Sequence, residues 1–127
     1  MDRAACPLRI LVVDRRPEVA DNLAALLSAH GHVVQAAPCA STALRAAKAF
    51  RPDAALIDLG DDGRETYAVA RAFRDAPELS KTFLVTMADG SAPMSAFMDR
   101  GPVDVHLVTP AAYRVVAGAL QCHFALA

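Results

Sequence analysis

A chain of 127 residues is long enough for one domain with a hydrophobic core, and we expect a single domain over residues 1–127. Hydrophobic residues make up 54% of the chain and charged residues 21%, which indicates a folded protein rather than a disordered one. The formal net charge of -1 gives no electrostatic reason to expect nucleic acid or an anionic membrane as a partner.

The cysteines and the apolar segments bear on the compartment of the protein. The 3 cysteines are widely spaced and form neither a disulfide framework nor a metal-binding pattern, which suits a reducing environment. The N-terminal segment makes a poor signal peptide, and no apolar segment is long enough to span a bilayer. We therefore expect a cytoplasmic protein.

Apolar runs and helical patterns alternate along the chain, which predicts five strands and five helices. The expected strands are residues 8–14, 33–36, 53–58, 82–87 and 103–108. The first expected helix begins at Pro17 and ends before Gly31, and the second has Ser41 as its N-cap and ends before Pro52. The other three expected helices cover residues 64–75, 93–100 and 111–124. Strict alternation of strand and helix predicts one parallel sheet with helices on both faces.

Two of the expected strands end in a carboxylate. The first ends at Asp14 and the third at Asp58, which is followed by a short acidic loop. Functional sites of parallel α/β sheets lie at the carboxyl ends of their strands. If the two strands are neighbours, Asp14 and Asp58 meet at this edge.

Four segments together resemble the receiver domain of two-component response regulators. They read ILVVD at residues 10–14, GHVV at 31–34, PDAALID at 52–58 and HLVTP at 106–110, and the likeness extends over residues 8–120. The resemblance implies a flavodoxin-like or CheY-like fold, in which a single doubly wound parallel sheet of five strands has the order 2-1-3-4-5 and carries five helices.

The same resemblance implies a phosphoryl-transfer site and its partners. In receiver domains a histidine kinase passes a phosphoryl group to an aspartate at a strand end, and Asp58 matches that phosphoacceptor. Receiver domains also bind Mg²⁺ there, through this aspartate, an acidic pair and a backbone carbonyl. Asp14, Asp58 and the carbonyl of Gly60 are the candidate ligands in this chain.

Three positions of the site depart from the receiver pattern. Arg15 stands where the second acidic residue is expected, Met87 where the switch hydroxyl is expected, and Thr109 where a lysine is expected. These departures put both Mg²⁺ binding and phosphorylation in doubt, so we expect a degenerate receiver with weak or no phosphoryl transfer. We further expect Arg15 to pair with Asp58 or Asp14 in place of the metal. Asp61 and Asp62 are either replacement ligands or a solvated turn.

Two further groups of residues are candidates for a ligand or partner surface. Arg64, Tyr67, Arg71 and Arg74 fall on one stripe of the third helix, where they could bind a nucleotide such as a cyclic dinucleotide, or simply form a solvated helix face. His106 and Tyr113 lie on the last strand and helix, a surface that mediates dimers and partner contacts in receiver domains.

No Ser-His-Asp arrangement, zinc spacing or phosphate-binding loop is present, so we expect no independent enzymatic activity. Two hypotheses remain open. In the first, the chain is a receiver-like signalling domain with impaired phosphorylation at Asp58, and its partners are a histidine kinase or other signalling proteins. In the second, it is a phosphorylation-independent pseudo-receiver that binds a protein or a nucleotide. A homodimer is compatible with both hypotheses.

Overall fold

The computed structural model describes residues 7–60, 64–89, 103–109 and 113–124. The strands are β1 (Arg9–Asp14), β2 (Val33–Ala37), β3 (Ala54–Asp58), β4 (Phe83–Asp89) and β5 (Val105–Thr109), and the α-helices are α1 (Pro17–Ala29), α2 (Ala40–Phe50), α3 (Arg64–Asp75) and α5 (Tyr113–Phe124). A short 3-10 helix, η2 (Pro77–Leu79), precedes β4. The helix expected at residues 93–100 lies outside the described residues.

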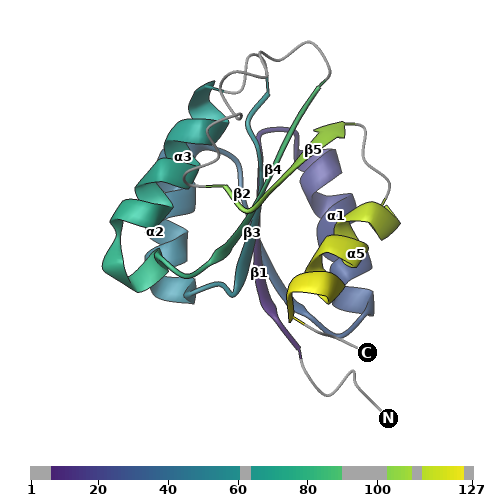
Figure 1. The fold of residues 1–127 in the computed structure, drawn as a ribbon. Helices are drawn as coiled ribbons and strands as arrows, with labels where there is room; N and C mark the ends of the chain where they lie inside the picture. The colour runs from purple at the N-terminus through teal and green to yellow at the C-terminus, as the bar shows by residue number, and fades with distance from the viewer. Residues whose placement is uncertain (1–6, 61–63, 90–102, 110–112, 125–127) are drawn as a thin grey trace.

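The strands form one parallel sheet in the order β2-β1-β3-β4-β5, as predicted. Helices α2 and α3 cover one face of the sheet, and α1 and α5 cover the other (Figure 1). This is the doubly wound arrangement of flavodoxin-like and CheY-like proteins. None of the described helices is both long enough and apolar enough to cross a membrane.

The two faces of the sheet carry separate hydrophobic clusters because successive strand residues point to opposite sides. Leu11 and Ile57 belong to the cluster under α2 and α3, which contains the fully buried ring of Phe73. Val12 and Leu56 belong to the cluster under α1 and α5. Both β1 and β3 are therefore covered on their two faces, as the continuous apolar runs in the sequence indicate.

The end of α1 agrees with the sequence prediction, whereas the start of α2 does not. Gly31 follows α1 with a φ of 92°, the left-handed conformation that favours glycine, so the predicted end of this helix is confirmed. The prediction of Ser41 as the N-cap of α2 was wrong, because the helix begins at Ala40 with Cys39 in the N-cap position.

Candidate functional site

The site lies at the carboxyl edge of the sheet, where β1 and β3 end. Asp14 and Asp58 are direct partners in the parallel register of these two strands. Their relative exposures are only 3% and 4%, although both are carboxylates. Two adjacent buried negative charges repel each other strongly, so this arrangement requires a neighbouring positive charge.

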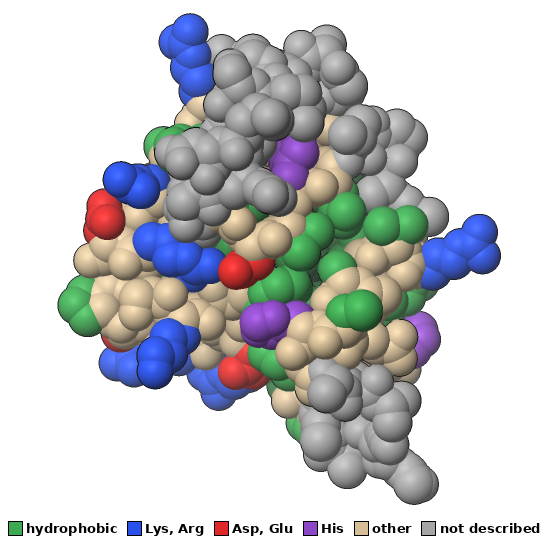
Figure 2. Space-filling model, viewed as in Figure 1, with side chains coloured by type: hydrophobic (Ala, Val, Ile, Leu, Met, Phe, Trp, Pro, Cys, Tyr) green, Lys and Arg blue, Asp and Glu red, His purple; other side chains and the backbone are tan. Residues whose placement is uncertain are grey.

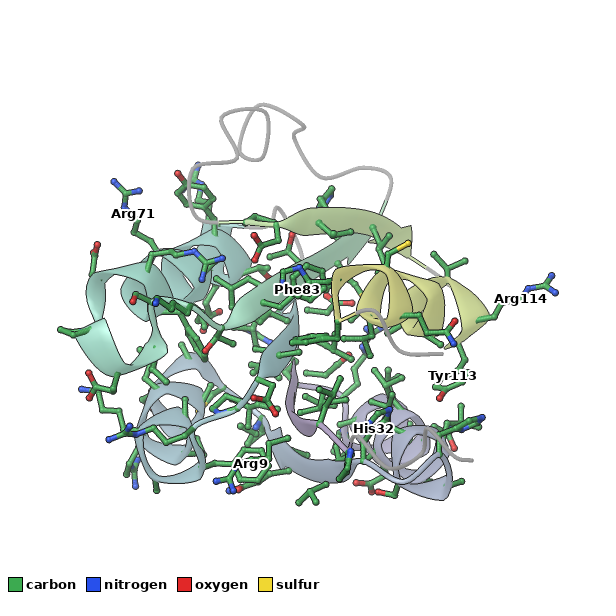
Figure 3. The ribbon with its side chains drawn as sticks, turned by 60° about the horizontal axis from the view of Figure 1, so that its bottom comes forward. Arg9, His32, Arg71, Phe83, Tyr113 and Arg114 are labelled. Carbon is green, nitrogen blue, oxygen red and sulfur yellow. The ribbon has the colours of Figure 1, made fainter. Side chains whose placement is uncertain are left out.

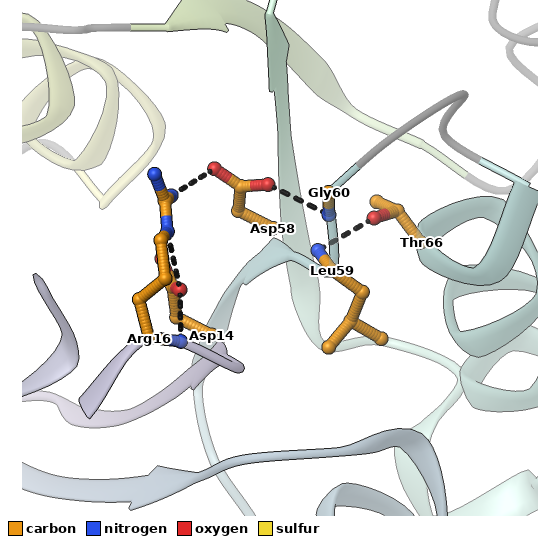
Figure 4. A network of polar contacts seen from close by, with 6 residues as sticks. All are labelled: Asp14, Arg16, Asp58, Leu59, Gly60 and Thr66. Atoms are coloured by element: carbon orange, nitrogen blue, oxygen red, sulfur yellow. Dashed lines mark hydrogen bonds and ion pairs between the residues drawn. The ribbon is translucent and has the colours of Figure 1, made fainter.

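The guanidinium group of Arg16 supplies that charge (Figure 4). Its Nε donates to Asp14 Oδ1 at 3.1 Å, and its Nη2 donates to Asp14 Oδ2 at 3.2 Å and to Asp58 Oδ2 at 2.9 Å. The hydrogen bond to Asp14 and the charges of both carboxylates raise the pKa of Arg16, against the opposing effect of burial. The Arg16 side chain is 54% exposed and pairs with both buried carboxylates. It therefore lies between these carboxylates and the solvent.

Arg15 was predicted to make this contact, and that prediction was wrong. Arg15 instead forms an ion pair with Glu65 in the first turn of α3, and both side chains are about half exposed. The local turn explains the difference. The backbone N–H of Arg16 donates to Asp14 Oδ1 at 2.9 Å, which folds the chain back over the carboxylate and brings the Arg16 side chain, rather than that of Arg15, above the site.

The loop after β3 is held by two hydrogen bonds at its start. The backbone N–H of Gly60 donates to Asp58 Oδ1 at 3.0 Å, and the N–H of Leu59 donates to the hydroxyl oxygen of Thr66 at 2.9 Å. Gly60 has a φ of 83°, and Thr66 is fully buried on α3. Each carboxylate oxygen of Asp58 is therefore already engaged, Oδ1 by Gly60 and Oδ2 by Arg16.

Met87 and Thr109, two of the positions predicted to depart from the receiver pattern, lie toward the carboxyl ends of β4 and β5 at the same edge of the sheet. In the register of β3 and β4, Ile57 is the partner of Thr86, so Met87 is the next residue alongside Asp58. Met87 is buried, and its thioether cannot donate a hydrogen bond to an anion. Thr109 ends β5, and its side chain lies outside the described part of the chain, as do Asp61 and Asp62.

Thr86 is not placed to act as the hydroxyl that the resemblance to receiver domains predicts at position 87. Its hydroxyl is fully buried and lies 2.9 Å from Nδ1 of His106, its register partner on β5. Burial lowers the pKa of His106. These two residues therefore form a polar contact between β4 and β5.

A magnesium ion of the kind that receiver domains use does not fit this set of residues. Mg²⁺ requires several oxygen ligands in near-octahedral geometry. Among the described residues, no group of three or more His, Cys, Asp or Glu side chains could hold a metal ion. The two carboxylates that are present already bond the guanidinium of Arg16. The role predicted for the Gly60 carbonyl stays a prediction.

The predicted stripe on α3 is only partly directed to solvent. Arg74 donates to the carbonyl oxygens of Ser80 and Thr82 at 3.1 and 2.7 Å, and it pairs with Asp104 at 2.6 Å. Its guanidinium thus joins the end of α3 to the segments before β4 and β5. Arg71 instead points away from the body of the protein (Figure 3).

The remaining members of the candidate surface lie on different elements. Arg64 is exposed in the first turn of α3, and Tyr67 is half-buried one turn further on. The hydroxyl of Tyr113 lies 3.1 Å from Nδ1 of His30, and it joins α5 to the end of α1 (Figure 3). Lys and Arg side chains gather on the α2 and α3 side of the view in Figure 2, whereas hydrophobic side chains are prominent beside α5.

The chain was compared with protein families, with curated sequences and with solved structures. No protein-family model and no curated protein sequence matches the chain. Solved structures do match. The chemotaxis protein CheY4 of Vibrio cholerae superposes with a TM-score of 0.80 and 19% identity, over 92% of this chain and 98% of that one. A CheY-like receiver domain from Methanospirillum hungatei gives a TM-score of 0.81 at 18% identity, over 93% and 94% of the two chains.

A third solved structure is also similar to the chain. The receiver domain of a sensor histidine kinase from Pseudomonas aeruginosa, which has a magnesium ion coordinated in its active site cleft, gives a TM-score of 0.79 at 19% identity over 92% of this chain and 97% of that one. The chain therefore has the fold of a CheY-like response regulator receiver domain. Within that fold, Arg16 and Thr66 are the site residues that the sequence prediction missed.

Proposed function

We propose that this chain is a receiver-like domain of two-component signal transduction in which phosphoryl transfer to Asp58 is impaired or lost. The observation that carries this proposal is the engagement of both Asp58 carboxylate oxygens, by Arg16 Nη2 and by the Gly60 N–H. An aspartate nucleophile must present an oxygen lone pair to the phosphorus atom, and a hydrogen bond to each oxygen lowers its nucleophilicity and crowds the approach.

The charge balance of the site supports the same proposal. Transfer between two anions is favoured by cations placed to neutralise the phosphoryl oxygens. Arg16 is the cation beside Asp58, but its charge already balances two carboxylates. Met87 and Thr109 add no charge at the positions that supply a hydroxyl and an ammonium group in receiver domains.

In this proposal the domain works in the cytoplasm through contacts with a histidine kinase, other signalling proteins or a second copy of itself, and it has no catalytic activity of its own. The alternative of a nucleotide-binding module is weaker. It depends on a row of arginines along α3, and Arg74 is already bound to Asp104 and to two backbone carbonyls.

A phosphorylation assay tests the proposal. The protein is incubated with Mg²⁺ and acetyl phosphate, a small phosphoryl donor, and its intact mass is measured beside an active receiver domain treated in the same way. We expect the active receiver to gain a phosphoryl group and this chain to gain little or none. A phosphoryl adduct on the wild-type chain that forms to the same extent as on the active receiver, and that is absent from the Asp58→Asn variant, would contradict the proposal.

A further inference from the structure

We propose that Arg16 is the resident cation of this site and excludes a divalent metal ion from it. The inference builds on the proposed function, because receiver-like folds are those that coordinate magnesium at this edge. It goes further by giving a residue of the chain itself the charge-balancing role of the ion. Its test measures metal binding without any phosphoryl donor, so the two proposals succeed or fail separately.

The contacts of Arg16 place it where an ion would have to bind. Its Nη2 lies 3.2 Å from Asp14 Oδ2 and 2.9 Å from Asp58 Oδ2, so one nitrogen bridges the two carboxylates. A metal ion that joined the same two oxygens would occupy the space of that nitrogen. Arginine and ion are therefore mutually exclusive ligands of the pair.

The neighbouring residue also disfavours a metal. Arg15 stands where receiver domains have a second acid, and it is fixed by its ion pair with Glu65 on α3. The loop that would be expected to supply carboxylates thus supplies two guanidinium groups. A divalent ion would lose a ligand there and would also meet a second positive charge.

In this proposal a divalent ion is excluded because Arg16 competes with it for the carboxylates of Asp14 and Asp58. Asp14 and Asp58 are buried and adjacent, and an uncompensated pair of this kind attracts a cation. The Arg16 side chain is 54% exposed, so its removal would leave the carboxylates open to solvent on that side. Loss of Arg16 should therefore create affinity for a divalent ion where the wild-type chain has little.

Titration with Mn²⁺ alone tests this inference, because the ion broadens the NMR signals of nearby amides. We expect the Arg16→Ala variant to show selective broadening at Asp14, Asp58 and Gly60 and to bind Mn²⁺ at least about tenfold more tightly than the wild type. The Arg15→Ala variant is the matched control, because it removes the same charge from the same loop without freeing the carboxylates. It should gain much less affinity than Arg16→Ala.

Two further variants keep the test decisive. Arg16→Gln removes the charge but keeps much of the side-chain length, so it replaces Arg16→Ala if the alanine variant does not give a folded amide spectrum. Adding Asp58→Asn to Arg16→Ala or to Arg16→Gln should abolish the Mn²⁺ binding that these variants gain. Selective, saturable Mn²⁺ binding at Asp14 and Asp58 in the wild type would overturn the inference, as would folded Arg16 variants that gain no affinity.

Discussion

The Arg16→Ala variant is expected to lose about 3 kcal/mol of unfolding free energy. Removal of one partner from a buried ion pair leaves an uncompensated charge and typically costs roughly 3–5 kcal/mol. We place the cost at the lower end because the Arg16 side chain is half exposed, so water can partly solvate the carboxylates once it is gone. Urea unfolding followed by circular dichroism measures the change.

A double-mutant cycle identifies the source of that loss. In an Asp58→Asn background one of the two repelling charges is absent, so Arg16→Ala should cost clearly less than in the wild type. Arg15→Ala is the control, since its ion pair with Glu65 is exposed on both sides and should contribute at most about 1 kcal/mol. Equal losses for Arg15→Ala and Arg16→Ala would show that Arg16 does not hold the carboxylates together.

The Thr66→Val variant is expected to lose about 2 kcal/mol of unfolding free energy. Valine has nearly the shape of threonine but cannot accept the hydrogen bond from the Leu59 N–H, which lies in a fully buried contact. A buried donor left without its acceptor costs roughly 1–3 kcal/mol. Urea unfolding measures the loss, and amide exchange at Leu59 and Gly60 should become faster because the loop after β3 is less firmly held.

Thr42→Val provides the comparison for this substitution. Thr42 lies in the first turn of α2 and is only partly buried, and its hydroxyl lies 3.1 Å from the Cys39 thiol, a weak hydrogen-bonding partner. The same chemical change there should alter stability by about 0.5 kcal/mol. A Thr66→Val variant as stable as Thr42→Val would mean that the hydroxyl of Thr66 does not support the loop.

The fold was largely predictable because its signals are strong and local. Continuous apolar runs marked β1 and β3 as buried parallel strands, and strict alternation with helices predicted a doubly wound sheet. The meeting of Asp14 with Asp58 was predicted on the condition that β1 and β3 are neighbours, and the resemblance to receiver domains supplied that strand order. Side-chain alternation also placed Thr86 correctly on the face opposite Met87, where it contacts His106.

The site was less predictable because it depends on how side chains turn after the strands end. Sequence position assigned the contact to Arg15, whereas the turn in which the Arg16 N–H bonds Asp14 brings Arg16 over the carboxylates. The spacing Asp-x-Arg before Pro17 was the available signal, since aspartate commonly bonds the backbone two residues ahead. Helical periodicity likewise grouped Arg74 with Arg71, but it could not predict the pairing of Arg74 with Asp104.

An amide NMR titration of the wild-type chain, first with Mg²⁺ and then with beryllofluoride, tests the central claim most directly. Beryllofluoride imitates a phosphoryl group on aspartate. If Arg16 takes the place of the magnesium ion, the signals of Asp14, Asp58 and Gly60 should stay unchanged through both additions. Saturable shifts at these residues that spread to β5 would instead show a working phosphorylation switch and would contradict the account.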